Sequence, residues 1–363
     1  MQTTIVRTTR TIHPLAALIG APALATCLLV PIARVQAHTF CVTNANATQL
    51  QDALTNSSDG GIYNGEDNFI HIAQGTYLTG APTGNGPFFY YSTATHQMVI
   101  LGGYNADCSS QTLKASLTKL DGGNSTGVLT LRSANGTILV SNLTLQNGQS
   151  AEPGAGLQVN YLVTVNAAVN ISDNIIRNNH STAANAGGLY ASGAGNGLNV
   201  SNNLIVGNST NGQDGAGYVT GYGQYNELYN NTVTQNVSMA FTNPDGGLYC
   251  GGTTPCQIYN NIFWNNTTYG IFLGNSGAIL SHNDYGTRGG ATPAQDVANL
   301  SVNPRFIDAA GGDFHLAGNS PLLGYGLPFG TITDLDGNAY PLKGKIDLGA
   351  YAETIFIDGF DGG

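Results

Sequence analysis

An asparagine followed five residues later by another asparagine recurs at a regular interval in five pairs between residues 142 and 266. The pairs are Asn142/Asn147, Asn174/Asn179, Asn203/Asn208, Asn231/Asn236 and Asn261/Asn266, and their first members lie 32, 29, 28 and 30 residues apart. A Gly-rich segment follows each of the first four pairs, starting at Gly154, Gly187, Gly215 and Gly246. Self-similarity at such a period indicates a solenoid, in which each repeat packs on its two neighbours.

The repeats contain short runs of Val, Ile, Thr and Tyr broken by Asn, Gly and Asp, which is the chemistry of strands and turns. We therefore predict an all-β fold, a parallel β-helix with apolar side chains pointing inward. An Asn at a constant coil position is expected to stack on its counterparts as a ladder of side-chain amides. Because a buried ladder must be hydrogen-bonded and needs no ligand, we interpret the Asn columns as structural.

The first 37 residues have the pattern of a secretory signal peptide. Arg7 and Arg10 precede an apolar stretch over residues 15–32, and the small residues before His38 suit cleavage after Ala37. An uncleaved membrane anchor is the alternative, but Pro and Gly interrupt a span that is barely long enough to cross a bilayer. We predict a bacterial protein that is secreted or held at the cell surface, with no transmembrane segment in the mature chain.

Charge limits the classes of partner. The signal region carries three of the 11 basic residues and none of the 21 acidic ones, so the mature chain has eight basic residues and a net charge of −13. That balance argues against nucleic acid and anionic lipid as partners. We expect a monomer whose partner, if it has one, is a polysaccharide.

Four cysteines remain after removal of the signal region, and an even number suits an oxidising compartment. Of the three possible pairings we favour Cys41–Cys108, which joins the N-terminal cap to an early coil, and Cys250–Cys256, which closes a short loop. Four unpaired thiols are the alternative.

The chain divides into five segments by pattern. Residues 1–37 are the signal peptide, 38–119 an N-terminal cap with the first coils, 120–290 the regular coils, 291–353 an irregular C-terminal cap, and 354–363 a tail. Leu50, Ala53 and Leu54 have helical spacing, so we expect a short helix that covers the open end of the first coil.

Several segments resemble secreted bacterial right-handed β-helix proteins of the pectate-lyase-like superfamily. They are residues 73–77, 102–108, 120–123 and 143–148 near the start, and residues 303–306, 313–316, 319–321, 334–338 and 347–351, which are similar to the choice-of-anchor Q domain of the same proteins. The resemblance spans nearly all of residues 38–353 and implies a right-handed coil. It does not single out a function, because this fold hosts many chemistries.

Enzymes of the superfamily that the chain resembles cleave acidic polysaccharides. They do so either by hydrolysis between two carboxylates or by β-elimination with a basic residue and a cation. The polygalacturonase motifs Asn-Thr-Asp, Asp-Asp, Gly-His-Gly and Arg-Ile-Lys are absent from the chain, which argues against a hydrolase. For a lyase, the charged constellation within the coils is Arg177 with Asp173 and His180. The alternative is that Arg177 lies on the outer face and pairs with Asp173.

Acidic residues suggest two calcium sites through their oxygen ligands. Asp214 and Asp245, with Glu152, precede Gly-rich strands and could form a carboxylate column; a solvated acidic edge is the alternative. Asp334 and Asp336 are spaced as in a calcium loop but lack its closing Glu. A turn network that holds the C-terminal cap is the alternative there.

Four tyrosines gather in one coil, Tyr218, Tyr222, Tyr225 and Tyr229, and alternation of strand residues places some of these rings outward. An outward aromatic row could stack on sugar rings, whereas packing under a loop would need no ligand. We therefore expect a glycan-contacting or adhesive β-helix protein. The alternative is a uronate lyase that uses Arg177 and carboxylate-bound Ca²⁺.

Overall fold

The computed structural model describes residues 36–43, 45–80, 83–161, 167–193, 195–242, 244–328, 333–340 and 344–353. Residues 1–35 of the predicted signal peptide and the whole tail 354–363 lie outside the described residues. The first strand begins at Ala37, so the predicted cleavage site falls inside it. Within the described part of the chain, no helix is both long and apolar enough to cross a membrane.

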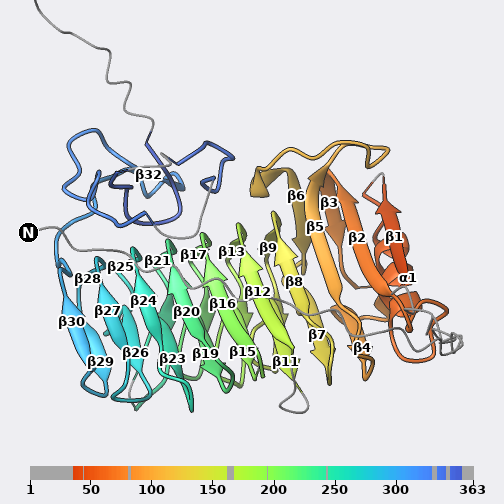
Figure 1. Ribbon diagram of the computed structural model, residues 1–363, viewed down its shortest axis with the longest axis horizontal. Coiled ribbons are helices and arrows are strands. Elements are labelled where there is room, and N and C mark those ends of the chain that lie inside the picture. Colours follow the sequence, from red (N-terminus) through yellow and green to blue (C-terminus); the bar gives the residue numbers. More distant parts are fainter. Residues whose placement is uncertain are drawn as a thin grey trace, which may run out of the picture. The chain divides into compact units, whose positions relative to one another are not determined.

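The chain forms the predicted right-handed parallel β-helix, and the coils follow one another in chain order (Figure 1). Sheet 1 is ten-stranded and consists of β1 (Ala37–Val42), β2 (Asp67–Ala73), β5 (Met98–Tyr104), β8 (Ile138–Ser141), β12 (Ala168–Ser172), β16 (Gly197–Ser201), β20 (Asn226–Tyr229), β24 (Gln257–Tyr259), β27 (Ile279–Ser281) and β30 (Gln295–Val297). Sheet 2 consists of β3 (Gly75–Leu78), β6 (Thr118–Asp121), β9 (Thr144–Gln146), β13 (Ile175–Arg177), β17 (Leu204–Val206), β21 (Thr232–Thr234), β25 (Ile262–Trp264) and β28 (Asp284–Tyr285). Sheet 3 consists of β4 (Phe88–Ser92), β7 (Leu129–Ser133), β11 (Leu157–Tyr161), β15 (Leu189–Ser192), β19 (Gly217–Gly221), β23 (Leu248–Gly252), β26 (Ile271–Leu273) and β29 (Arg288–Gly290).

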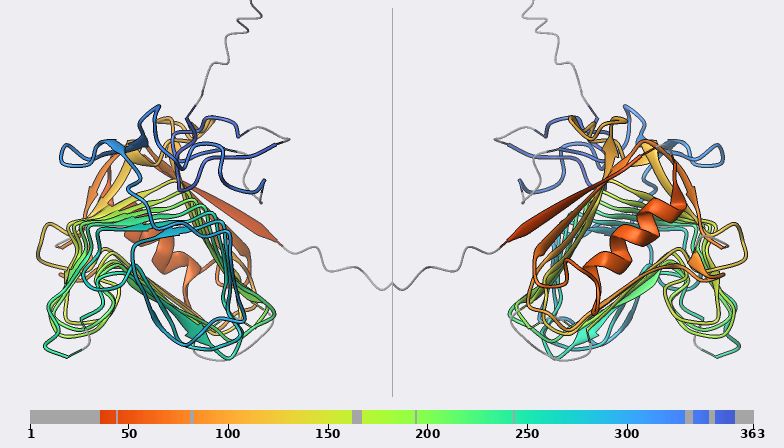
Figure 2. Two further views of the ribbon diagram at one scale, coloured as in Figure 1. Left: turned by 90° about the vertical axis from the view of Figure 1, so that its left-hand side faces the viewer. Right: turned by 90° about the vertical axis from the view of Figure 1, so that its right-hand side faces the viewer.

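A regular coil passes through the sheets in a fixed order. After sheets 3, 1 and 2, the chain adds a two-residue strand to a small fourth sheet before it returns to sheet 3. The small sheet consists of β10 (Gln149–Ser150), β14 (His180–Ser181), β18 (Ser209–Thr210) and β22 (Val237–Ser238). Figure 2 shows that successive coils superpose when they are viewed end-on.

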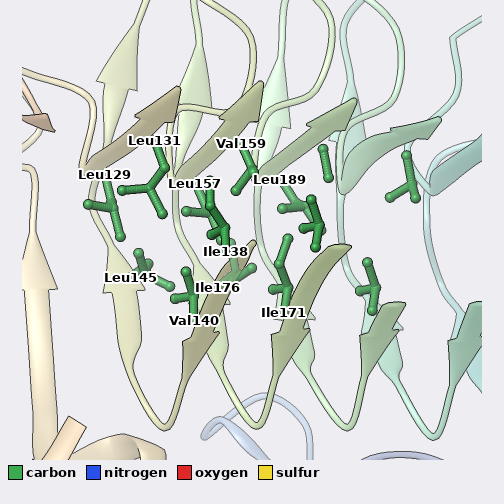
Figure 3. Packing of buried hydrophobic residues seen from close by; sticks show 14 of the residues in the cluster. Leu129, Leu131, Ile138, Val140, Leu145, Leu157, Val159, Ile171, Ile176 and Leu189 are labelled. Carbon is green, nitrogen blue, oxygen red and sulfur yellow. The ribbon is translucent and has the colours of Figure 1, made fainter. Parts of the chain in front are cut away.

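The core is a set of apolar columns that run from coil to coil. Parallel pairing in constant register places Leu157 beside Leu189 in sheet 3 (Figure 3). It also places Ile176 beside Ile205 in sheet 2, and all four side chains are fully buried. Burial of one such side chain stabilises the fold by about 1.5–3 kcal/mol. The alternating pattern of the sequence therefore becomes a continuous core with one layer per coil.

A helix covers the N-terminal opening, as predicted. α1 (Ala47–Ser57) begins after Asn46, whose side chain accepts a hydrogen bond from the backbone N–H of Gln49 and so caps the helix. Its apolar face buries Leu50 and Leu54 in the core. Figure 2 shows α1 across the end of the first coil, where it shields the sheet edges.

Two asparagine ladders lie at the turns on either side of sheet 2. In the first ladder, the side-chain amide of each Asn donates to the side-chain oxygen of the Asn in the next coil, at 2.9–3.2 Å. Its members are Asn174, Asn203, Asn231, Asn261, Asn283 and Asn299. In the second, Asn179, Asn208, Asn236 and Asn266 are linked in the same way at 2.9–3.0 Å. The first ladder therefore continues two coils beyond the fifth predicted pair.

The first predicted pair is out of register by one residue. Pairing of Ser141 with Ser172 aligns Asn142 with Asp173, so Leu143 occupies the ladder position and its N–H donates to Asn174. Asn142 has a φ of 61° and belongs to the neighbouring column of left-handed residues, which also contains Asp173 and Asn202. Asn readily adopts the left-handed conformation and also suits a ladder. The sequence therefore does not distinguish the left-handed position from the ladder position that follows it.

Both favoured disulfides are present. Cys41–Cys108 ties β1 to the turn after β5, and Cys250–Cys256 closes the loop between β23 and β24. Cys250 and Cys256 are fully buried in the core.

The C-terminal segment lies along the side of the coils, against the outer face of sheet 2 (Figure 1). We call its described residues from 306 to 353 the strap; they include the antiparallel pair β31 (Phe306–Asp308) and β32 (Asp313–Leu316). Phe314 and Tyr351 of the strap pack on outward Ile175 and Leu204. The apolar residues on this face of sheet 2 are buried because the strap covers them.

Candidate functional site

Four aromatic side chains form a row on the outer face of sheet 3: Tyr190, Tyr218, Tyr249 and Phe272. Each follows an inward residue in its strand, and the register pairs each with its neighbour in the next coil. The rings are stacked, with centroids 5.6, 4.4 and 6.0 Å apart and interplanar angles of 8, 6 and 18°. Parallel strands in register impose this stack, because equivalent residues repeat at about 4.8 Å. We call these four residues the aromatic row.

Glycines make room for the row. A Cβ at Gly251 or at Gly274 would overlap the phenol of Tyr249, so that ring lies along the sheet where no side chain competes with it. The Gly-rich composition of sheet 3 thus has a local purpose, which is close approach of a large ring to the backbone.

Uncharged polar groups accompany the row. The strands of sheet 3 contain no charged residue except Arg132 and Arg288. Beside the row, Thr220 donates a hydrogen bond to Ser192 at 3.0 Å. The face is therefore a strip of aromatic edges, hydroxyls and amides with little charge.

The predicted tyrosines fall in different places. Tyr218 belongs to the aromatic row, and Tyr222, with 43% of its surface exposed, lies close enough to influence Tyr218 electrostatically. Tyr225 is not in the row, because its ring covers Gly197, the first residue of β16 in sheet 1. The sequence analysis does not predict Tyr190, Tyr249 and Phe272; the signal for the first two is a Tyr at a constant offset in the Gly-rich segments that start at Gly187, Gly215 and Gly246.

The row does not present its ring faces as a sugar platform would. Within the stack, each inner ring face is covered by the next ring, so the exposed surface consists mainly of ring edges. Burial and the neighbouring tyrosines raise the pKa of Tyr218 to about 12, so its phenol keeps its proton at neutral pH. The row therefore offers C–H edges and neutral hydroxyls, with Tyr222 as an exposed ring beside it.

Two buried carboxyl groups lie beside the row. Asp214 and Asp245 occupy equivalent turns in adjacent coils, where the N–H of Gly215 donates to the carbonyl of Asp245 at 2.8 Å. Only 4% and 3% of their surfaces are exposed. Burial raises the pKa of Asp214 to about 8, with a further contribution from Asp245, and raises that of Asp245 to about 7. Glu152, the third predicted member of this column, is exposed.

One oxygen of this pair lacks a hydrogen bond. Asp245 Oδ1 accepts from the N–H of Gly247 at 3.0 Å, whereas the buried Asp245 Oδ2 has no partner. An unpaired buried anion is unfavourable, so the pair is better suited to holding protons than to carrying two charges. Within the described residues there is no group of three or more His, Cys, Asp or Glu side chains placed to share a metal ion.

The three residues of the lyase hypothesis are not brought together by a shared contact. Arg177 donates from Nε and Nη2 to Gln146 Oε1, at 2.9 and 2.6 Å. The Asp173 carboxylate accepts from Asn202 at 2.6 Å, and burial raises its pKa. His180 shares a 2.9 Å hydrogen bond with Ser209 in the small sheet. Asn turns on both sides of β13 bend the chain, so the three side chains leave the coil at different corners.

The alternative ion pair is also absent: no salt bridge joins Arg177 to Asp173, both of which the structure describes. The partner of Arg177 is Gln146, which occupies the equivalent position of sheet 2 in the preceding coil. Register across coils, rather than spacing along the chain, therefore decides this contact.

Asp334 and Asp336 are engaged within the strap. Asp334 accepts four hydrogen bonds, from the backbone N–H groups of Asp336, Asn338 and Ala352 and from the side chain of Asn338. Asp336 forms ion pairs with Lys114 at 3.2 Å and with His315 at 3.4 Å. Both carboxylates thus act in a turn network and in attachment of the strap.

No protein-family model, curated protein sequence or solved structure matches the chain. The functional argument therefore depends on the geometry of the described residues.

Proposed function

We propose that this protein is exported and binds a neutral polysaccharide along the outer face of sheet 3. The aromatic row is the observation that supports the proposal. It runs across the strands, parallel to the direction in which coils are added, and repeats once per coil at about 4.8 Å. A glycan chain laid along the row would meet a similar group at each coil.

The chemistry of the strip suits an uncharged sugar. Ring edges and half-buried phenols provide apolar contact together with hydroxyl groups that both donate and accept hydrogen bonds. Half-buried Ser192 adds a further hydroxyl at the same face, where Thr220 and Gln158 are buried. An acidic glycan would instead require basic residues along the strip, whereas Arg132 in β7 and Arg288 in β29 lie in strands outside the aromatic row.

Export is part of the proposal for two reasons. The N-terminal sequence has the pattern of a signal peptide, and both disulfides need an oxidising compartment to persist. Attachment at the cell surface and release from the cell are both compatible with this role.

Binding is tested with Tyr249→Ala and Tyr218→Ala, each compared with Tyr229→Ala, which removes a half-buried Tyr from sheet 1 instead. Affinity electrophoresis through gels that contain neutral or uronate polysaccharides gives the readout. We expect retardation by a neutral glycan, weakened about 3- to 10-fold by either row variant and unchanged in Tyr229→Ala. Equal loss in all three variants, or retardation by uronate polymers alone, would contradict the proposal.

A further inference from the structure

The core columns end in a different kind of residue at the C-terminal end of the solenoid. β28, β29 and β30 are the terminal strands of sheets 2, 3 and 1, and Figure 1 shows them together at one end of the coils. The end of a solenoid presents unpaired sheet edges and the last layer of the core, so it favours the addition of another chain. The N-terminal end is covered by α1, whereas the strap packs on the side of the coils.

Polar residues take the inward positions of the last coil. Strand register continues the column of Phe263 with Tyr285, that of Ile271 with Arg288 and that of Leu280 with Asp296. The three apolar residues of the preceding coil belong to the buried core, so the polar side chains that follow them lie over its end. We call Tyr285, Arg288 and Asp296 the end plug.

Asp296 joins the members of the end plug. Its Oδ1 accepts hydrogen bonds from the hydroxyl of Tyr285 and from the side-chain amide of Asn299, each at 2.7 Å. Its Oδ2 lies 3.6 Å from Nε of Arg288, and Arg288 Nη1 donates to the carbonyl of Ala291 at 2.9 Å. Asn299 is the last member of the first ladder, so Asp296 supplies the acceptor that the Asn of a further coil would provide.

We propose that the end plug prevents a second copy of this chain from docking on the last coil. All three residues of β30 are exposed, so this edge strand is free to pair with its counterpart in a two-fold dimer. Such docking would bury the side chains of Arg288 and Asp296, which are 23% and 34% exposed in the single chain. Removal of two charges from water is costly, so inward-pointing charged residues act against association at a sheet edge.

Sedimentation equilibrium of Arg288→Leu/Asp296→Leu tests this inference. We expect the wild type to sediment as one chain, and the double variant to show a concentration-dependent rise toward about twice that mass or more, because its last layer is apolar. Arg305→Leu/Asp308→Leu is the matched control, since it replaces one exposed basic and one exposed acidic residue away from the end plug. The control should sediment as one chain.

Circular dichroism and thermal unfolding show whether each variant folds. If the leucine variant does not fold, Asp296→Ala provides the second route, because it removes the acceptor that joins the end plug and leaves a small apolar side chain. It should also associate, whereas Asp308→Ala should not. Plug variants that sediment as their controls do would overturn the inference. Glycan binding does not enter this measurement, so the result is independent of the proposed function.

Discussion

The side-chain amide of Asn203 donates to the side-chain oxygen of Asn231, its counterpart one coil on, at 3.0 Å. The same amide also donates to the carbonyls of Ile171 and Ser201, while Asn203 Oδ1 accepts from the backbone and side chain of Asn174. Asn203 therefore satisfies five buried hydrogen bonds at one turn.

Asn203→Ala should lower the free energy of unfolding by about 1–3 kcal/mol, because it leaves buried donors of Asn174 without an acceptor. Urea denaturation followed by circular dichroism measures the change. Asn211→Ala is the control, since Asn211 is an exposed residue whose side chain donates to the carbonyl of Thr182. Equal stability of the two variants would be inconsistent with a buried ladder.

The sequence predicted the fold well because a solenoid repeats its local rules in every coil. Asn, Gly and apolar positions recur with the coil, so periodicity alone indicated the parallel β-helix and its ladders. It did not fix which Asn enters the ladder where two adjacent turn positions both suit Asn, as at Asn142. Only the strand register with Ser172 resolves that choice.

The candidate site was predicted less completely. Tyr218 was found from a local cluster, whereas the row is a relation between coils and becomes visible only when Tyr190 and Tyr249 are aligned with it. The contact of Arg177 with Gln146 depends on register between coils, which the spacing of residues along the chain does not give. The predicted disulfide pairing is confirmed. Cys250 and Cys256 are close in sequence, so pairing them leaves Cys41 and Cys108 as the other pair.

The two disulfides should differ in their contribution to stability. Cys41–Cys108 spans 67 residues and Cys250–Cys256 only six, so the chain-entropy estimate gives about 4 and about 2 kcal/mol. Paired Cys→Ser variants compared by denaturant unfolding measure both contributions. A larger loss from removal of the short disulfide would show that packing of Cys250 and Cys256 in the core outweighs loop closure.

Stability should fall as the pH rises from about 4 to about 8. The folded-state pKa values of Asp214 and Asp245, about 8 and about 7, exceed the ordinary value near 3.9, so the folded protein binds protons that the unfolded chain has released. The resulting penalty is absent at acidic pH and complete above about pH 8. Melting temperatures of Asp245→Asn should vary less with pH than those of the wild type or of Asp52→Asn, an exposed control; parallel profiles would contradict this assignment.

Calcium should not raise the melting temperature at pH 8. Asp214 and Asp245 supply only two carboxylates, and Asp334 and Asp336 are occupied by protein donors and cations. Scanning calorimetry with calcium or magnesium chloride measures this directly. A calcium-specific increase that Asp245→Asn abolishes would place a metal ion at the pair, and calcium-dependent unsaturated product from a uronate polymer would favour the lyase alternative.

Gly274→Ala should disturb the aromatic row without removing a ring. Its new Cβ would meet the hydroxyl of Tyr249, so that ring must move away from the sheet. We expect weaker retardation by neutral glycan with secondary structure retained. Gly318→Ala, at a position with open space around the Cβ, is the matched control, and equal binding by both variants would show that the placement of Tyr249 is unimportant.

The strap changes how the coils can come apart. The strap is hydrogen-bonded to three successive coils, through the pairs Thr333 with Asn202, Ala350 with Thr232 and Gly349 with Asn260. Asp336 of the strap also forms an ion pair with Lys114, near the beginning of the solenoid. In a bare solenoid, a pull on the last coil would peel one layer at a time. Here the same pull must first detach the strap, because it links coils that are distant along the solenoid. The coils therefore resist stretching, and stepwise attack by proteases, as one unit.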